Sequence, residues 1–393
     1  MSPRIATFLI FVVNGAMVGT WLANIPWISG HLDASRTQIG VVLLCTAAGA
    51  LVAMTITGQL LTRVSTRRMV IVSSLLLPLL APVPLLAPSL GALAAVMVVF
   101  GFVNGVMDVS MNAHGVALER RTGRPIISSL HAGWSVGGLL GAACVALAAA
   151  AKVEPAVEAA IAGAALIGVT LVAIPFLGRA TIEGEPRPEG GSRLTLPSRA
   201  VLPLGVLAVL AAVVEGGIGD WAGLYLQRDL GVEAGIAALA YTAFALGLTG
   251  GRLTGDWMNR RYGAGRLLQA GMAVVAVAVG VVLFASSPAL ALPGLVVAGI
   301  GVANAIPLVF SAGGHIPPSG PSLAAVFTMT YTAFLAGPPI LGFIADHIGL
   351  PATFGLIVVA AVVGAVVAPR TPGIDAANQL AAGAATGEQP ATA

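Results

Sequence analysis

Charged residues are scarce in this sequence: only 9% of its 393 residues are Asp, Glu, Lys or Arg. About a quarter of the residues in an average soluble domain are charged, so the composition excludes an ordinary water-soluble protein. Hydrophobic residues make up 57% of the chain, and its mean hydropathy is +0.96. They form about twelve apolar runs, and a membrane-spanning helix takes ~20 residues. The sequence therefore predicts a polytopic membrane protein.

Cysteine is nearly absent, and catalytic motifs are missing from the sequence. Cys45 and Cys144 both fall in apolar runs, which indicates small buried side chains without a metal or redox role. There is no Walker motif, no Gly-x-Ser-x-Gly elbow and no other catalytic constellation. We therefore expect no enzyme activity, no nucleotide-driven pumping, no metal and no cofactor.

Long basic runs are also missing, because no run of Arg or Lys exceeds two residues. The net charge of +3 and the pI of about 9.2 therefore do not indicate a nucleic-acid partner. The first residues, Met1 to Arg4, lead directly into an apolar run without a cleavage site. We expect this run to be a retained span and not a signal peptide.

The apolar runs predict an all-α integral membrane protein with twelve transmembrane helices in two six-helix bundles. The expected helices cover residues 5–28, 38–62, 69–87, 90–114, 127–150, 156–177, 202–227, 236–258, 267–285, 289–311, 322–345 and 350–368.

Basic residues set the predicted orientation, because they favour the cytoplasmic side of a membrane. Twelve spans put both termini on one side. If that side is the cytoplasm, fifteen basic residues are cytoplasmic, and only Arg36, Lys152 and Arg228 lie outside. We therefore expect a multi-pass protein of the bacterial cytoplasmic (inner) membrane with both termini inside.

One long polar segment, residues 179–199, interrupts the apolar pattern and predicts a cytoplasmic linker. It separates an N-terminal bundle, residues 1–178, from a C-terminal bundle, residues 200–370. The remaining residues, 371–393, are rich in Ala, Gly, Thr and Gln and predict a disordered cytoplasmic tail.

The two halves carry similar residues about 200 positions apart. Asn14 matches Glu215, and Asn104 matches Asn304. In the fifth and eleventh spans, His131 and Trp134 match Tyr331 and Phe334. Parallel six-span repeats characterise one transporter architecture, in which the solute site lies between the repeats near the midplane.

Residues 58–68 resemble the loop motif of the major facilitator superfamily, Gly-x-Leu-x-Asp-Arg-x-Gly-Arg-Arg in outline. Thr62 replaces the Asp of that motif, and Ser65 replaces its second Gly. A second copy covers residues 255–263, and a related run covers residues 342–349. The resemblance extends over nearly the whole chain.

Three further stretches resemble a bacterial subgroup of the superfamily that is distantly similar to fucose permease: residues 105–114, 119–125 and 129–135. The resemblance implies alternating access, with a solute and often protons moving through a central cavity.

Three ionisable residues inside the spans are candidates for proton coupling: Asp108, Glu215 and His131. An ionisable group at this depth costs ~3 kcal/mol and is usually functional or paired. Asp108 shares one helical face with Asn104 and Asn112, and burial without a nearby cation favours its protonated form. For each candidate, an interhelical hydrogen bond without a transport role remains the alternative.

Solute binding is predicted for scattered amide and aromatic side chains, since an aromatic wall with amides suits sugars and amphipathic rings. For Trp21 and Trp221, a position at the membrane interface is the alternative. Arg252 and Asp256 are spaced to pair within one helix, as a structural or gating element. The candidate binding residues are Asn14, Trp21, Asn24, Asn104, Asn112, Trp134, Asp220, Trp221, Tyr241, Asn304 and Tyr331; the gating candidates are Arg63, Arg67, Arg252 and Asp256.

We interpret the sequence as a monomeric secondary active transporter that moves a small polar or sugar-like solute by proton-coupled alternating access in the lipid bilayer. The second interpretation is a proton-coupled efflux antiporter for amphipathic compounds. The Gly-Pro-x-x-Gly-Gly run expected for such antiporters is absent from residues 136–141, whereas residues 337–342 read Gly-Pro-Pro-Ile-Leu-Gly. The sequence also leaves open a transporter-like solute sensor and a membrane-embedded enzyme.

Overall fold

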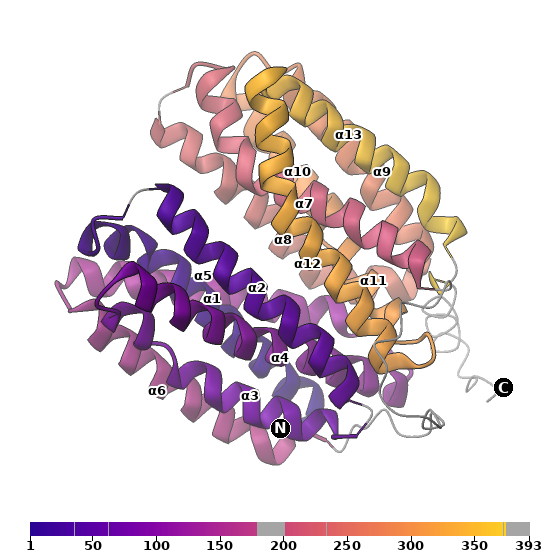
Figure 1. Ribbon diagram of the computed structural model, residues 1–393. Helices are drawn as coiled ribbons and strands as arrows, with labels where there is room; N and C mark the ends of the chain where they lie inside the picture. Colours follow the sequence, from indigo (N-terminus) through magenta and orange to yellow (C-terminus); the bar gives the residue numbers. More distant parts are fainter. Residues whose placement is uncertain (35, 62, 179–200, 233, 372, 375–393) are drawn as a thin grey trace. The chain divides into compact units, whose positions relative to one another are not determined.

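A computed structural model describes residues 1–34, 36–61, 63–178, 201–232, 234–371 and 373–374. The predicted linker, residues 179–199, and nearly all of the predicted tail lie outside the described residues. The chain divides into two compact units. The first contains α1 to α6, and the second contains α7 to α13 together with residues 122–129 (Figure 1).

The helices of the first unit follow the predicted spans closely. They are α1 (Pro3–His31), α2 (Arg36–Leu60), α3 (Thr66–Leu79), α4 (Leu90–Thr122), α5 (Ile127–Ala150) and α6 (Pro155–Ala173), with short 3-10 turns at Val83–Leu86 and Ile174–Phe176. Side-chain N-caps define where α1, α3 and α6 begin. The side chains of Ser2, Ser65 and Glu154 each accept a hydrogen bond from the backbone N–H three residues later.

The second unit repeats this plan. Its helices are α7 (Leu202–Arg228), α8 (Ala234–Tyr262), α9 (Ala264–Leu283), α10 (Pro288–Val302), α11 (Ala305–Gly313), α12 (Ser319–His347) and α13 (Leu350–Val367), followed by a 3-10 turn at Ala368–Arg370. Helices α7, α8, α10, α9 and α13 contact one another in a closed circuit, and α12 packs against α7 and α13. Because α10 and α11 together form one crossing, the described helices supply the twelve predicted spans.

Two predicted spans differ from the observed helices. The fourth was expected to end at residue 114, but α4 continues to Thr122. The extension begins next to the fully buried His114, whose Nδ1 lies 3.2 Å from the Thr66 hydroxyl, and it includes the buried Glu119; Arg121 and Thr122 at its end are exposed. The tenth span, expected to be continuous over 289–311, is broken between α10 and α11. A cause is Pro307, which has no N–H to donate to the Ala303 carbonyl four residues earlier.

Close helix crossings confirm that the two halves share one packing plan. In the first unit, a Cβ at Gly49 would meet the Val98 carbonyl, and one at Gly101 would meet the Thr46 carbonyl. In the second unit the counterparts lie 198 positions later: Gly247 against Val296, and Gly299 against Phe244. The α2–α4 and α8–α10 crossings are therefore equivalent.

This spacing also revises one predicted match. Asn104 corresponds to Val302 in the α2–α4 and α8–α10 packing, two positions before Asn304. The two asparagines therefore do not occupy equivalent places in the packing, although each is near its own unit's copy of this helix crossing.

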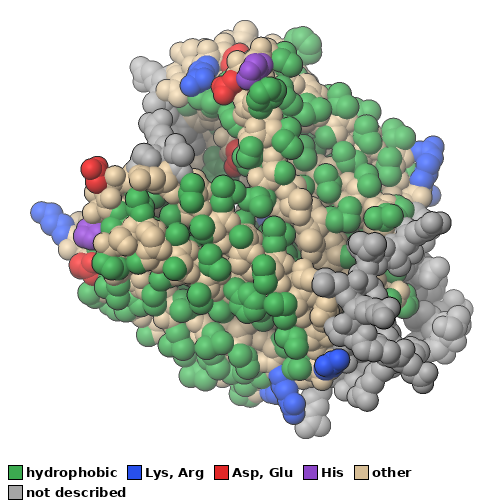
Figure 2. All heavy atoms as spheres, viewed as in Figure 1, with side chains coloured by type: hydrophobic (Ala, Val, Ile, Leu, Met, Phe, Trp, Pro, Cys, Tyr) green, Lys and Arg blue, Asp and Glu red, His purple; other side chains and the backbone are tan. Residues whose placement is uncertain are grey.

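Large hydrophobic side chains are exposed on both units, as Figure 2 shows for one face of the molecule. Leu147 and Ile161 in the first unit are 70% and 63% exposed, and Val277 in the second is 70% exposed. Eleven of the described helical segments are long and apolar enough to cross a membrane. An outer surface of this kind matches hydrocarbon and not water, so the prediction of a multi-pass membrane protein is confirmed.

Candidate functional site

Three predicted binding residues of the first unit form one hydrogen-bonded cluster. The Asn14 amide on α1 donates to Asn104 Oδ1 on α4 over 3.0 Å. The Trp134 indole on α5 donates to Asn14 Oδ1 over 2.9 Å. Gly15 permits this contact, because a Cβ there would meet the Trp134 backbone. Asn14 is only 1% exposed, so the cluster joins three helices inside the unit.

A second cluster in this unit links two of the predicted proton-coupling residues through an amide. Asn112 Nδ2 donates to Asp108 Oδ1 over 3.0 Å, and Asn112 Oδ1 lies 3.0 Å from His131 Nε2. Because an amide oxygen can only accept, His131 Nε2 carries the proton in this arrangement. Asp108 and His131 are both buried. Asn112 therefore connects the Asp108 carboxyl group on α4 to the His131 imidazole on α5 through hydrogen bonds.

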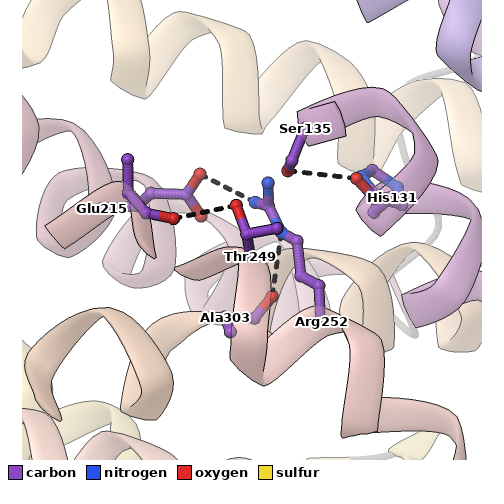
Figure 3. Close-up of polar contacts among 7 residues, drawn as sticks. His131, Ser135, Glu215, Thr249, Arg252 and Ala303 are labelled. Carbon is purple, nitrogen blue, oxygen red and sulfur yellow. Dashed lines mark hydrogen bonds and ion pairs between the residues drawn. The ribbon is translucent and has the colours of Figure 1, made fainter. Parts of the chain in front are cut away.

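The second unit contains a buried ion pair that the sequence did not predict. Arg252 Nη2 on α8 lies 2.9 Å from Glu215 Oε1 on α7, and their side chains are 3% and 15% exposed (Figure 3). Arg252 Nε also donates to the Ala303 carbonyl over 3.2 Å. The Ala303 carbonyl is free to accept from Arg252 because Pro307, four residues later, has no N–H to donate to it. The helix break and the position of the Arg252 side chain are therefore linked.

The described partner of Arg252 is Glu215, whereas the predicted Arg252–Asp256 pair stays a prediction. Asp256 Oδ1 accepts the backbone N–H of Ser129 over 3.2 Å, within the second unit. The spacing within one helix made Asp256 the nearest acid in sequence, but the close approach of α7 brings Glu215 to the guanidinium. Glu215 is consequently a paired carboxylate, not the isolated one that the sequence suggested.

Asn304 has a local role at the helix break. Its Nδ2 donates to the Gly251 carbonyl over 3.1 Å, which ties the start of α11 to α8. Its Oδ1 is buried without a hydrogen-bond partner in the described part of the chain.

The remaining binding candidates are spread over both units. In the first, Trp21 packs against Phe100 with ring centroids 6.4 Å apart, and the Asn24 amide donates to the Thr20 carbonyl over 2.9 Å. In the second, the Trp221 Nε1 is buried and has no described partner, and Tyr331 lies against Phe334. Asp220 and Tyr241 are exposed. These residues do not belong to the hydrogen-bonded clusters described above.

The two gating candidates that follow α2 differ in their environment. Arg63 is exposed. The Arg67 guanidinium instead donates to the carbonyls of Leu177 and Ile174, over 2.9 and 3.1 Å, at the end of α6. A cation at a helix C-terminus satisfies free carbonyls and the helix dipole, so Arg67 fastens α3 to α6.

Glu158 on α6 is a buried acid that sequence reasoning did not name as a site residue. Both of its carboxyl oxygens are buried without a hydrogen-bond partner in the described part of the chain. A signal was present, because Glu158 is the only acid in the predicted span 156–177.

Comparisons with known proteins decide the family. The model of the Major Facilitator Superfamily matches residues 7–330 and 204–388. The chain belongs to the Major Facilitator Superfamily. It is 31% identical to an uncharacterised transporter, y4wD, of Sinorhizobium fredii, covering 91% of this chain and 95% of the relative. It is 29% identical to an uncharacterised MFS-type transporter of Yersinia pestis, covering 91% and 92%.

The superfamily fold is also shared with solved structures. The outward conformation of FucP matches with a TM-score of 0.79 over 94% of this chain and 98% of that one, at 14% identity. A second structure, titled as the E. coli fucose:proton symporter FucP, matches with a TM-score of 0.73 at 16% identity. The predicted resemblance to the superfamily, and its distant similarity to FucP, are confirmed.

Proposed function

We propose that this protein is a secondary active transporter that moves a small polar or sugar-like solute across the bacterial cytoplasmic membrane, coupled to protons. Membership of the superfamily supports a solute carrier. The fold shared with a fucose:proton symporter supports a sugar-like solute and proton coupling. The observation that carries the proposal is the buried Asp108–Asn112–His131 cluster.

The chemistry of this cluster suits proton coupling. An ionised Asp108 accepts from Asn112 Nδ2, as described above. A protonated Asp108 can donate, and it then competes with His131 for the Asn112 oxygen. Proton binding on α4 would in this way release the imidazole on α5, which connects protonation to the packing of two helices. Asp108 is the first candidate for the coupling proton.

The Glu215–Arg252 pair supplies the second candidate. Protonation of Glu215 removes the charge that faces the guanidinium, and Arg252 would then be held by the Ala303 carbonyl. Since Arg252 cannot lose its own proton, the pair responds to protons only through Glu215. Arg252 and Asp256 are proposed gating residues on this basis, with Arg63 and Arg67 at the α2–α3 turn.

Amide and indole groups are the proposed solute contacts. Asn14, Asn104 and Trp134 already exchange hydrogen bonds with one another, and a hydroxylated solute could take over these donors and acceptors one at a time. Alternating access would follow from movement of the two predicted bundles, residues 1–178 and 200–370, about the cytoplasmic linker 179–199.

A thermal-shift screen of metabolites, followed by uptake into proteoliposomes, tests the proposal. A ligand present at 100 times its dissociation constant adds ~2.7 kcal/mol of stability, so a binder should raise the unfolding temperature clearly. The same compound should accumulate in vesicles only when an inward proton gradient is imposed. Binding without flux would favour a solute sensor instead, and flux without a proton requirement would remove the coupling.

Efflux of amphipathic compounds remains the second candidate because of a pocket in the second unit. It has a volume of about 390 Å³ and lies between α7, α12 and α13, with an almost wholly apolar lining that includes Val213, Met329, Ile340 and Leu356. Such a lining suits a hydrophobic ring more than a sugar. Export of a fluorescent amphipathic dye from cells, abolished by Met329→Trp, would favour this function.

A further inference from the structure

Glu158 is a buried acid that the proposed coupling mechanism does not use. It lies one turn into α6, after the exposed N-cap residue Glu154. Glu158 is 7% exposed, and neither Oε1 nor Oε2 has a hydrogen-bond partner among the described residues. The Asn24 side chain on α1 faces it. A carboxylate ion in such a place is far more costly than the neutral acid.

No cation on the described elements packed against α6 compensates for Glu158. These elements are α1, α3 and the 3-10 turn Val83–Leu86. The turn has no ionisable side chain, and Arg67 and Arg68 of α3 lie near the other end of α6, where Arg67 binds Leu177.

The charged groups of α1 and of the loop before α6 are exposed. On α1, Arg4 lies in the first turn, and the exposed His31 stacks on Trp27 with ring centroids 4.6 Å apart. Lys152, in the loop before α6, is exposed to solvent. Glu158 therefore faces the Asn24 amide and no described cation.

We propose that Glu158 is a proton-binding site of the first unit, separate from Asp108, which holds its proton while α1 is packed against α6. Loss of that proton leaves a buried carboxylate that faces the Asn24 amide but no described cation, so ionisation favours separation of α1 from α6 and access of water. The bound species is a proton and not a metal ion, because a cation would need several more oxygen ligands.

Infrared spectroscopy of the purified protein in liposomes tests this site without any solute. A protonated carboxyl group has a C=O stretch that disappears on ionisation, and it can be followed by titration from about pH 4 to about pH 9. We expect the parent protein to show such a band at neutral pH, and Glu158→Gln to lose the component of the band that comes from Glu158, while any component from Asp108 stays. Glu154→Gln, four residues earlier at an exposed position, is the matched control and should keep the band.

Thermal unfolding provides the second readout. Gln resembles the neutral acid, so Glu158→Gln should unfold within about 1 °C of the parent at low pH, and at higher temperature than the parent where Glu158 ionises. An unchanged infrared band in Glu158→Gln, or a marked loss of stability at all pH values, would overturn the proposal. A band that titrates with Na⁺ concentration instead of pH would replace the proton with a metal cation. Loss of the band together with normal coupling through Asp108 supports two separate sites, whereas failure of coupled uptake alone would count only against the proposed function.

Discussion

A carboxyl group packed among apolar helices is stable only with a partner or with a proton, and Glu215, Asp108 and Glu158 differ in this respect. Glu215 faces Arg252 over 2.9 Å. Asp108 accepts from an amide on its own helix, which in turn contacts an imidazole. Glu158 faces Asn24. The environment of Glu215 thus supplies a cation to the ionised carboxylate, and that of Glu158 supplies an amide.

The first residue-scale prediction concerns Asp108→Asn. Asn keeps the shape and can still exchange a hydrogen bond with Asn112, but it cannot titrate. We expect the variant to fold with an unfolding temperature close to that of the parent, because Asn keeps the contact with Asn112 and places no charge inside the unit. Accumulation of solute driven by a proton gradient should fall by about 100-fold, the order of effect attributed to loss of a group that transfers protons, while exchange of solute without a gradient persists.

The control for this variant is Asp346→Asn, which removes an exposed acid near the end of α12. It should transport like the parent. If Asp108→Asn still concentrates solute with unchanged pH dependence, the proton passes elsewhere, and Glu215 becomes the coupling residue.

The second residue-scale prediction concerns the ion pair. Removing one partner of a buried pair typically costs ~3–5 kcal/mol, because the other charge remains. Glu215→Gln should destabilise more than Arg252→Gln, since a stranded glutamate can take up a proton and a stranded arginine cannot release one. The double variant should lose less than the sum of the two, by on the order of 2 kcal/mol. Thermal unfolding in detergent measures all three, and strictly additive losses would mean that the two side chains do not interact.

The third prediction, at the scale of the helices, concerns the equivalent helix crossings of the two units. Gly101→Ala and Gly299→Ala each place a methyl group against a backbone carbonyl, of Thr46 and Phe244 respectively. Because backbone cannot move aside as a side chain can, each should destabilise by ~1–3 kcal/mol. Gly91→Ala, also on α4 but with no atom near the added methyl, should be neutral or stabilising by up to ~1 kcal/mol. Similar unfolding temperatures for Gly91→Ala and Gly101→Ala would contradict the close crossing.

The elements were largely predictable because the bilayer imposes a length on each apolar run. What hydropathy could not reveal was the break between α10 and α11, since residues 302–308 are apolar apart from Asn304. Pro307 was the available signal, although prolines are tolerated in many spans. The extension of α4 to Thr122 was missed for the opposite reason: its polar residues, Glu119 to Thr122, suggest a loop, but Glu119 is buried and the helix continues through them.

The candidate site was predictable as a set of residues but not as a set of contacts. Asn14, Asn104 and Trp134 were all named from sequence, yet their mutual hydrogen bonds depend on how three helices meet. The Glu215–Arg252 pair was missed because local spacing favoured Asp256, whereas a contact 37 residues apart requires the packing of α7 on α8.

At the scale of the whole molecule, the orientation in the membrane stays a prediction, and the sequence offers a simple test of it. Lys152 is the only lysine of the chain and is exposed in the loop between α5 and α6. Basic residues are predicted to gather on the cytoplasmic side, which leaves this loop outside. An impermeant amine-reactive reagent should therefore label the protein in intact cells, and Lys152→Arg should abolish the labelling.

The matched control places the single lysine on the opposite side of the membrane in the predicted topology. In the Lys152→Arg background, Arg68→Lys places a lysine at an exposed position at the start of α3, within the predicted cytoplasmic turn. This double variant should react only after the cells are made permeable. If it is labelled in intact cells while Lys152 of the parent is protected, the topology is inverted. The α6 turn that carries Glu158 would then lie on the cytoplasmic side, and its proton would exchange with the cell interior. The orientation thus determines with which compartment each proposed site exchanges its proton. The coupling experiments need this result to assign the direction of proton movement.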